Sequence, residues 1–265
     1  MSKLKRATST GVGKKFLSAI SGVALTLFLI THLLGNLTIF KGRGELFNAY
    51  AGFLGGLPGI SIASLAIVAI LLFHAYTGYR VWSENKQARP QEYYAGRPTG
   101  SDRSRKTFAS TTMMLSGFIV VAFTIVHIWH FKYGMIGAEH LQDKAAMSSL
   151  TAPRADDPAG QTAEALTGGD TTRGGAEAMQ GNPQEEHHNL AGLVLSEFKK
   201  PWVSLFYLVS LAFVGLHVSH GISSAFQSMG AGRLSASLRM AGRLFTILLI
   251  GGFMSIPLWV MFFRR

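Results

Sequence analysis

Apolar residues along this chain are gathered into five long runs, which are separated by polar and glycine-rich segments. Each run has about 20 residues, the length that an α-helix needs to cross roughly 30 Å of hydrocarbon. We therefore expect an all-α integral membrane protein. Its five transmembrane helices are predicted over residues 16–39, 60–82, 108–131, 202–226 and 243–262.

The polar segments divide the chain into four parts. Residues 1–15 form a basic head, residues 16–136 hold the first three helices, and residues 198–265 hold the last two. Residues 137–197 form an insertion rich in Ala, Gly, Thr and Pro that contains ten of the fourteen acidic residues. We expect this insertion to be extracytoplasmic and partly disordered, and we expect a short interfacial helix over Glu45–Leu54.

Basic residues are concentrated on one side of the expected membrane. The head and the connections after the second and fourth helices share that side and hold 15 of the 25 Lys and Arg residues. The positive-inside rule then predicts a cytoplasmic N-terminus and an extracytoplasmic C-terminus, in a bacterial-type cell inner membrane. We attribute the net charge of +11 to this topology and to lipid headgroups, and expect no nucleic-acid partner.

Six of the nine histidines lie in the apolar runs, where a titratable side chain is costly and indicates function. Counting from the expected outer helix ends places His32 and His127 in one layer. His74 and His217 form a second layer, roughly 12 Å deeper at about 1.5 Å per residue. Each layer offers two imidazoles from different helices, as axial ligation of one haem iron requires.

The chain contains no cysteine, which excludes disulfides, thiolate-bound iron–sulfur clusters and covalently attached haem c. The predicted cofactors are therefore two non-covalent haem b groups. We expect the first four helices to form a bundle around these two stacked haems, with His32 and His127 on the outer haem and His74 and His217 on the inner one.

A short repeat supports this arrangement. SGVALTLFLITH at 21–32 and SGFIVVAFTIVH at 116–127 each place a glycine ten residues before the histidine, roughly 15 Å towards the inner layer. The inner-layer histidines are each followed by a glycine four residues later. We expect four glycines to make room for haem: Gly22, Gly117, Gly78 and Gly221.

Two alternatives remain within the histidine motifs HIWH at 127–130 and HVSH at 217–220. Depth favours His127 and His217 as ligands, but His130 and His220 lie on neighbouring positions. A metal-dependent membrane enzyme or a transporter that uses both motifs is a further alternative. The remaining histidines lie in the polar insertion, where we expect ordinary solvated residues: His140, His187 and His188.

Several stretches resemble the membrane-anchor subunit, the five-helix di-haem cytochrome b, of succinate dehydrogenases and fumarate reductases. These stretches are ITHL at 30–33, GELFNA at 44–49, FHAYTGY at 73–79, VHIW at 126–129 and LHVSHG at 216–221. The resemblance covers all five helices but not the insertion, and it implies the same four histidine ligands.

The resemblance further implies that the chain is no enzyme alone but a subunit of a succinate:quinone oxidoreductase. Its partners would be a flavoprotein with FAD and an iron–sulfur subunit on the cytoplasmic face, in a heterotrimer that can form higher oligomers. Electrons would pass between the iron–sulfur subunit and membrane quinone, either menaquinone or ubiquinone. The alternative is the di-haem cytochrome b subunit of another quinone-linked respiratory dehydrogenase or reductase.

Two further groups of residues follow from this interpretation. Haem propionates need cationic or hydroxyl partners, and the inner helix ends offer Arg80, Ser18 and Lys15. Quinone chemistry moves protons as well as electrons, so it needs polar groups near a haem. The candidates near the outer haem are Glu45, Asn36 and Arg43.

Overall fold

The computed structural model describes residues 10–41, 44–88, 112–133, 189–230 and 236–263. These residues form helices and short turns, and five of the helices are long and apolar enough to cross a membrane. The five are α2 (Gly11–Leu37), α4 (Ile60–Gln87), α6 (Met113–His127), α11 (Pro201–Ser228) and α12 (Ala236–Phe263). The protein is thus an all-α, multi-pass membrane protein, as the sequence predicts.

Four shorter elements complete the described chain. α2 continues into a 3₁₀ turn, η1 (Thr38–Phe40), and α6 continues into a π-helical turn, η3 (Ile128–Lys132). α3 (Glu45–Gly56) confirms the expected short helix between the first two spanning helices. α10 (Leu190–Lys199) precedes α11, so residues 190–197, which we expected to belong to a partly disordered insertion, are part of a defined helix.

Local chemistry explains where these helices begin. α2 starts in the basic head rather than at residue 16, because the Thr10 hydroxyl accepts a hydrogen bond from the Gly13 amide at 3.1 Å. The Asn189 side chain caps α10 in the same way, 2.9 Å from the Gly192 amide. α3 and α4 each follow a glycine with positive φ, Gly44 and Gly59, a conformation that other residues rarely adopt.

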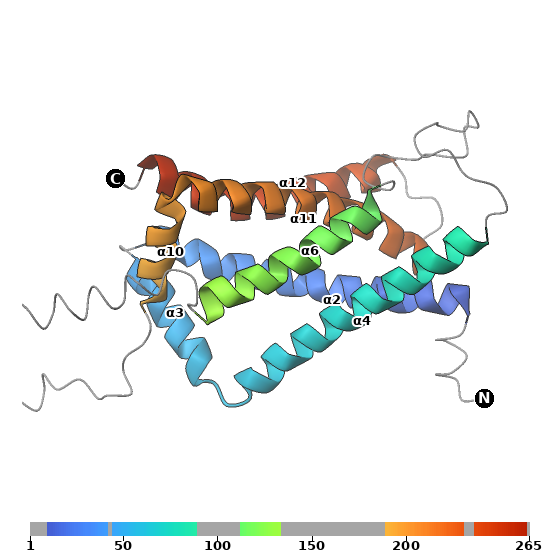
Figure 1. The fold of residues 1–265 in the computed structure, drawn as a ribbon, viewed down its shortest axis with the longest axis horizontal. Coiled ribbons are helices and arrows are strands. Elements are labelled where there is room, and N and C mark those ends of the chain that lie inside the picture. Colours follow the sequence, from blue (N-terminus) through green and yellow to red (C-terminus); the bar gives the residue numbers. More distant parts are fainter. Residues whose placement is uncertain (1–9, 42–43, 89–111, 134–188, 231–235, 264–265) are drawn as a thin grey trace, which may run out of the picture.

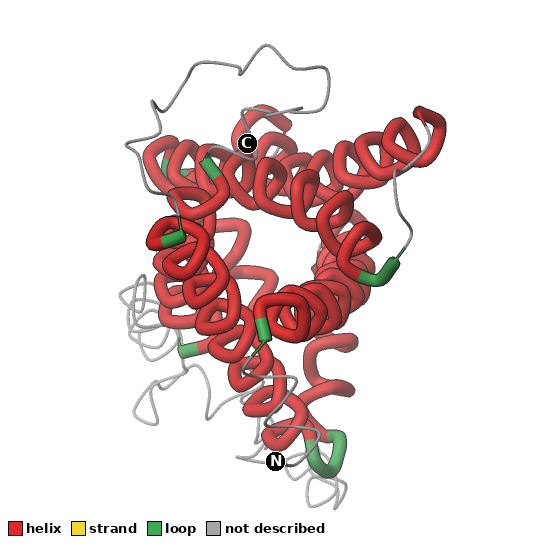
Figure 2. Tube along the Cα trace, turned by 90° about the vertical axis from the view of Figure 1, so that its right-hand side faces the viewer, coloured by secondary structure: helices red, strands yellow, loops and turns green. Residues whose placement is uncertain are grey.

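Successive spanning helices run in opposite directions, so the two termini lie at opposite ends of the molecule (Figure 1). α2 packs against α4 and α11, and α11 also packs against α6 and α12. Figure 2 shows helices arranged around a common axis, and the contacts between helices identify α2, α4, α6 and α11 as the bundle. In this arrangement α2 lies diagonally opposite α6, and α4 lies diagonally opposite α11; neither diagonal pair packs closely.

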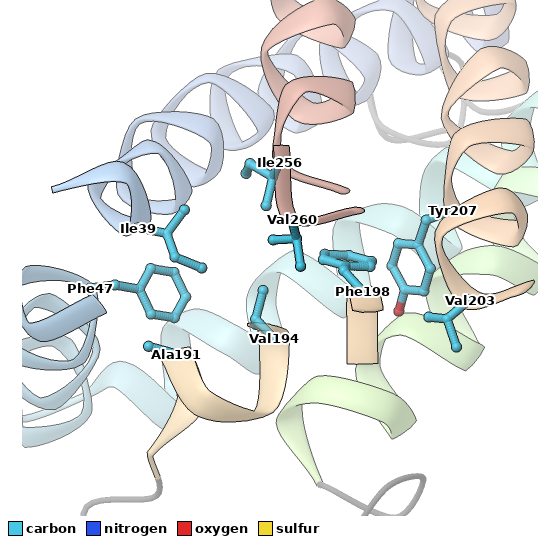
Figure 3. Close-up of a cluster of buried hydrophobic side chains, with 9 residues drawn as sticks. All are labelled: Ile39, Phe47, Ala191, Val194, Phe198, Val203, Tyr207, Ile256 and Val260. Atoms are coloured by element: carbon cyan, nitrogen blue, oxygen red, sulfur yellow. The ribbon is translucent and has the colours of Figure 1, made fainter. Parts of the chain in front are cut away.

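Buried apolar side chains gather in two clusters. One cluster joins α3, α10 and the adjoining ends of α11 and α12, with Phe47, Val194 and Phe198 among its members (Figure 3). Burying a side chain of this size stabilises the fold by about 1.5–3 kcal/mol, which explains why α10 is held against the bundle. The second cluster lies between α2, α11 and α12.

The outer faces of the spanning helices are apolar and highly exposed. Ile62 on α4 and Leu248 on α12 are 75% and 74% exposed, as expected for side chains that face lipid. Exposed aromatic residues lie near the helix ends, with Trp129 and Trp202 towards α10 and Trp82 at the opposite end. Such aromatic side chains are typical of the two membrane–water interfaces.

Candidate functional site

Two pairs of histidines meet across the two diagonals of the bundle. The ring centroids of His32 on α2 and His127 on α6 are 5.9 Å apart, and the ring planes are nearly perpendicular at 85°. Those of His74 on α4 and His217 on α11 are 6.2 Å apart at 76°. We call the first the outer pair, because it lies towards α3 and α10, and the second the inner pair. The pairing predicted from depth along the helices is the pairing that the structure has.

The separation of the rings in each pair is suited to a single metal ion between them. A metal–imidazole bond is about 2.0–2.1 Å long, so two imidazoles on opposite sides of one ion would place their centroids roughly 6 Å apart. Among the described residues no third histidine, cysteine or carboxylate joins either pair. A bare metal ion usually takes more than two protein ligands, so this donor set fits a metal whose other ligands come from a macrocycle such as haem.

The inner pair is oriented by serines on the neighbouring helices. His74 Nδ1 lies 3.0 Å from the main-chain carbonyl of Ser18 and 3.1 Å from the hydroxyl of Ser21. A carbonyl only accepts hydrogen bonds, so Nδ1 carries the proton and donates it. Nε2 of His74 is then the unprotonated nitrogen, which is the form that binds a metal.

His217 repeats this arrangement on the other diagonal helix. Its Nδ1 lies 3.3 Å from the Ser116 hydroxyl, and that hydroxyl donates to the Met113 carbonyl at 3.0 Å. The Ser116 oxygen is therefore left to accept from Nδ1 of His217, and Nε2 is again the unprotonated nitrogen. The Ser-Gly dipeptides that open the two sequence repeats thus hold the two inner histidines.

The glycines of these dipeptides lie at the inner layer, but their protein neighbour is an imidazole. A Cβ atom on Gly22 would lie 3.0 Å from Cε1 of His74, and one on Gly117 would lie 3.4 Å from Cε1 of His217. At Gly78 and Gly221 an added Cβ would meet no protein atom within 4 Å. No neighbouring protein atom accounts for glycine at these two positions, so their packing against haem stays a prediction.

Aromatic rings, rather than hydrogen bonds, surround the outer pair. Phe28 stacks on His32 with centroids 5.3 Å apart, and Phe123 lies 5.6 Å from His127. Phe253 of α12 lies 5.8 Å from His32, so the fifth helix also lines this site, which the sequence did not indicate. Nδ1 of His127 is the single buried side-chain nitrogen or oxygen among the described residues without a hydrogen-bond partner, which marks this histidine as unusual.

The second histidine of each motif takes a different position. His130 is 3% exposed, and both of its ring nitrogens have protein partners: Nε2 lies 3.2 Å from Glu197 and Nδ1 lies 3.1 Å from the Tyr207 hydroxyl. The π-helical turn η3 begins directly after His127 and contains His130. His220, one turn beyond His217, has no ring contact with either pair among those found in the described chain.

The residues expected to meet propionates have other partners. Arg80 is exposed and donates to the Tyr76 hydroxyl and to Glu84, both at 3.1 Å. Ser18 contributes its main-chain carbonyl to His74, and Lys15 is exposed. The buried cation at this end is Lys14, which forms an ion pair with Glu84 between α2 and α4.

The quinone candidates that the structure describes lie at the end of the bundle near α3 and the outer pair. Glu45 is exposed at the start of α3, and the Asn36 side chain donates to the main-chain carbonyl of His32 at 2.7 Å. Arg43 lies outside the described residues, as do His140, His187 and His188. The buried acid at this end is Glu197 of α10, which the sequence placed in the insertion.

No family model, curated protein or solved structure matches this chain. Its class therefore follows from the fold and the site alone. It is an all-α membrane protein with five spanning helices, in which two histidine pairs meet across the diagonals of a four-helix bundle.

Proposed function

We propose that the chain is the membrane anchor and di-haem b electron-transfer subunit of a succinate:quinone oxidoreductase. The observation that supports this proposal most directly is the pair of His–His distances, 5.9 Å and 6.2 Å, on the two diagonals of the bundle. The sequence stretches that resemble the anchor subunits of succinate dehydrogenases and fumarate reductases include all four of these histidines.

In this proposal His32 and His127 hold the outer haem, and His74 and His217 hold the inner one. Haem b supplies reversible one-electron redox chemistry, and ligation by two histidines leaves no iron position for oxygen. The chain would keep the inner ligands in the metal-binding tautomer through the Ser18 carbonyl at His74 and the Ser116 hydroxyl at His217. Aromatic side chains around the outer pair exclude water, which stabilises neutral imidazoles there.

The charge distribution supports the proposed orientation and partners. The chain is basic at the ends of α2 and α4 that lie opposite to α10, where Lys14, Lys15, Arg80 and Lys86 are found. This end would face the cytoplasm and the iron–sulfur subunit, which would in turn bind the flavoprotein. The chain would transfer electrons between that subunit and quinone, and would not oxidise succinate alone.

Reduction of the bound haem by different electron donors tests this proposal. Membranes containing the native complex should show haem b reduction by succinate, and this reduction should be lost when His74→Ala or His217→Ala removes the inner haem. Reduction by formate or hydrogen, but not by succinate, would instead identify another quinone-linked enzyme. A folded protein without haem would contradict both possibilities.

A further inference from the structure

Four polar side chains form a continuous hydrogen-bonded series at the end of the bundle that α10 covers. Lys200 Nζ lies 2.8 Å from Oε1 of Glu197, and Oε2 of the same carboxylate lies 3.2 Å from Nε2 of His130. Nδ1 of His130 then lies 3.1 Å from the Tyr207 hydroxyl. The series therefore joins α10, η3 and α11.

The series runs from the protein surface into the interior. Lys200 is 46% exposed by side chain, whereas Glu197 is 1% exposed and His130 is 3% exposed. At its inner end the Tyr207 ring lies 6.0 Å from the ring of His127, a member of the outer pair. A hydrogen-bonded route therefore connects the surface at Lys200 with the surroundings of the outer histidines.

Packing alone does not require ionisable groups at this position. Glu197 is almost fully buried on α10, directly before Phe198, a member of the apolar cluster that also contains Val194 and Val203 (Figure 3). Removing a carboxylate from water costs several kcal/mol, and well-packed apolar residues often replace a buried ion pair without loss of stability. A buried acid–imidazole pair with a route to the surface therefore calls for a chemical role.

We propose that Glu197 and His130 form a proton-exchange site that serves the outer end of the bundle. The proton passes from Nε2 of an imidazolium to Oε2 of the carboxylate, which leaves a neutral imidazole and a carboxylic acid. The acid then releases this proton to water beside Lys200, and no electron moves in either step. The groups facing the pair are Lys200, Tyr207 and, beyond the Tyr207 ring, His127.

This inference rests on the proposed function for its purpose. Oxidation of a quinol to a quinone releases two electrons and two protons; the electrons leave singly along the electron-transfer path, and the protons need a base. Glu197 and His130 would accept these protons one at a time, and would deliver them when quinone is reduced. The Tyr207 hydroxyl, 3.1 Å from Nδ1 of His130, would pass a proton to that nitrogen while taking one from the quinol side, so that it ends the transfer unchanged.

Infrared difference spectra of the full-length protein across a pH titration test the inference directly. The wild type should show the C=O stretch of a protonated carboxyl group, together with an imidazole change, and Glu197→Gln should abolish both. Lys199→Gln is the matched control, because it removes an exposed charge from the same helix and should leave both signals unchanged. Signals that persist in Glu197→Gln, or disappear in Lys199→Gln, would overturn the inference.

Redox potentiometry and a second variant, His130→Gln, test the same proton-exchange site independently. In haem-loaded protein the midpoint potential of the outer haem should depend on pH in the wild type and in Lys199→Gln, and this dependence should be lost in Glu197→Gln. If Glu197→Gln fails to fold, His130→Gln should still remove the imidazole change and shift the carboxyl band; an unchanged spectrum would contradict the proposal. The infrared result does not need haem, so its failure and the failure of the proposed function are separable.

Discussion

Ser21 and His74 are joined across the α2–α4 contact, with the serine hydroxyl 3.1 Å from Nδ1 of the imidazole. The Ser21 hydroxyl also donates to main-chain carbonyls of its own helix, at Leu17 and Ser18, so its oxygen is free to accept from the histidine. Ser116 and His217 repeat this relationship. The serine of each Ser-Gly dipeptide therefore helps to orient one inner histidine, and the Ser18 carbonyl fixes the tautomer of His74.

Replacing Ser21 by alanine should weaken inner haem binding. Removal of a hydrogen bond to a metal-binding histidine typically lowers metal affinity by about 10–100-fold. Haem titration into the apo-protein, followed by absorbance, should therefore show this loss at one of two sites. Ser18→Ala is the control, because Ser18 uses its main-chain carbonyl, and it should bind haem as the wild type does. Equal loss in both variants would contradict the role of the Ser21 hydroxyl.

Alanine at the two Ser-Gly glycines should have unequal effects. At Gly22 the new Cβ would lie 3.0 Å from the His74 ring, so the ring must move; at Gly117 the distance of 3.4 Å is close to ordinary contact. Gly22→Ala should therefore shift the spectrum of the inner haem more than Gly117→Ala does. Low-temperature α-band spectra would measure the shift in each variant. A larger shift in Gly117→Ala than in Gly22→Ala would contradict the steric effect expected from the distances to the histidine rings.

Alanine at Gly78 or Gly221 tests whether these residues lie against haem. No protein atom stands within 4 Å of the new Cβ, and replacing a helical glycine by alanine otherwise stabilises a helix by up to about 1 kcal/mol. Haem content per chain should nevertheless fall in both variants. Gly251→Ala offers a matched control, since its Cβ is equally unobstructed but lies on the exposed face of α12. Full haem content in all three variants would remove Gly78 and Gly221 from the haem site.

Single histidine substitutions should remove one haem each. His32→Ala or His127→Ala should abolish the outer haem, and His74→Ala or His217→Ala the inner haem, because each iron then lacks one axial ligand. His130→Ala should retain both haems, since its ring nitrogens bind Glu197 and Tyr207 instead. Redox potentiometry of each variant separates the two haems. Loss of a haem in His130→Ala, with His127→Ala unaffected, would exchange the roles of these two residues.

The ion pair of Lys14 and Glu84 should contribute to stability at the inner end. The Lys14 side chain is 9% exposed, so removing its partner leaves a nearly buried ammonium group without a counter-charge. Glu84→Gln should lower the free energy of unfolding in detergent. Lys14→Met in the same protein should recover most of this loss. Glu45→Gln, at an exposed position, should change stability by less than about 0.5 kcal/mol.

The spanning helices and the histidine pairing could be predicted because each has a strong local signal. Long apolar runs fix the helices, and the positions of His32, His74, His127 and His217 along alternating helices fix the pairs. Both signals follow from membrane thickness and helical rise, which do not depend on side-chain packing.

The surroundings of α10 could not be predicted in the same way. Its ten residues lie at the end of a segment whose composition is polar and rich in glycine, which hid the apolar spacing of Leu190, Val194 and Phe198. The burial of Glu197 depends on this helix folding back over α11 and α12. The capping residue Asn189 was the local signal that could have shown where α10 begins.

The central claim is that the two histidine pairs hold two b-type haems, and haem content measures it most directly. The purified full-length protein, analysed as its pyridine haemochrome and by a dithionite-reduced minus oxidised spectrum, should show a b-type α-band and two haems per chain. A well-folded protein that shows no such band, even when it is produced with ample haem, would contradict the account.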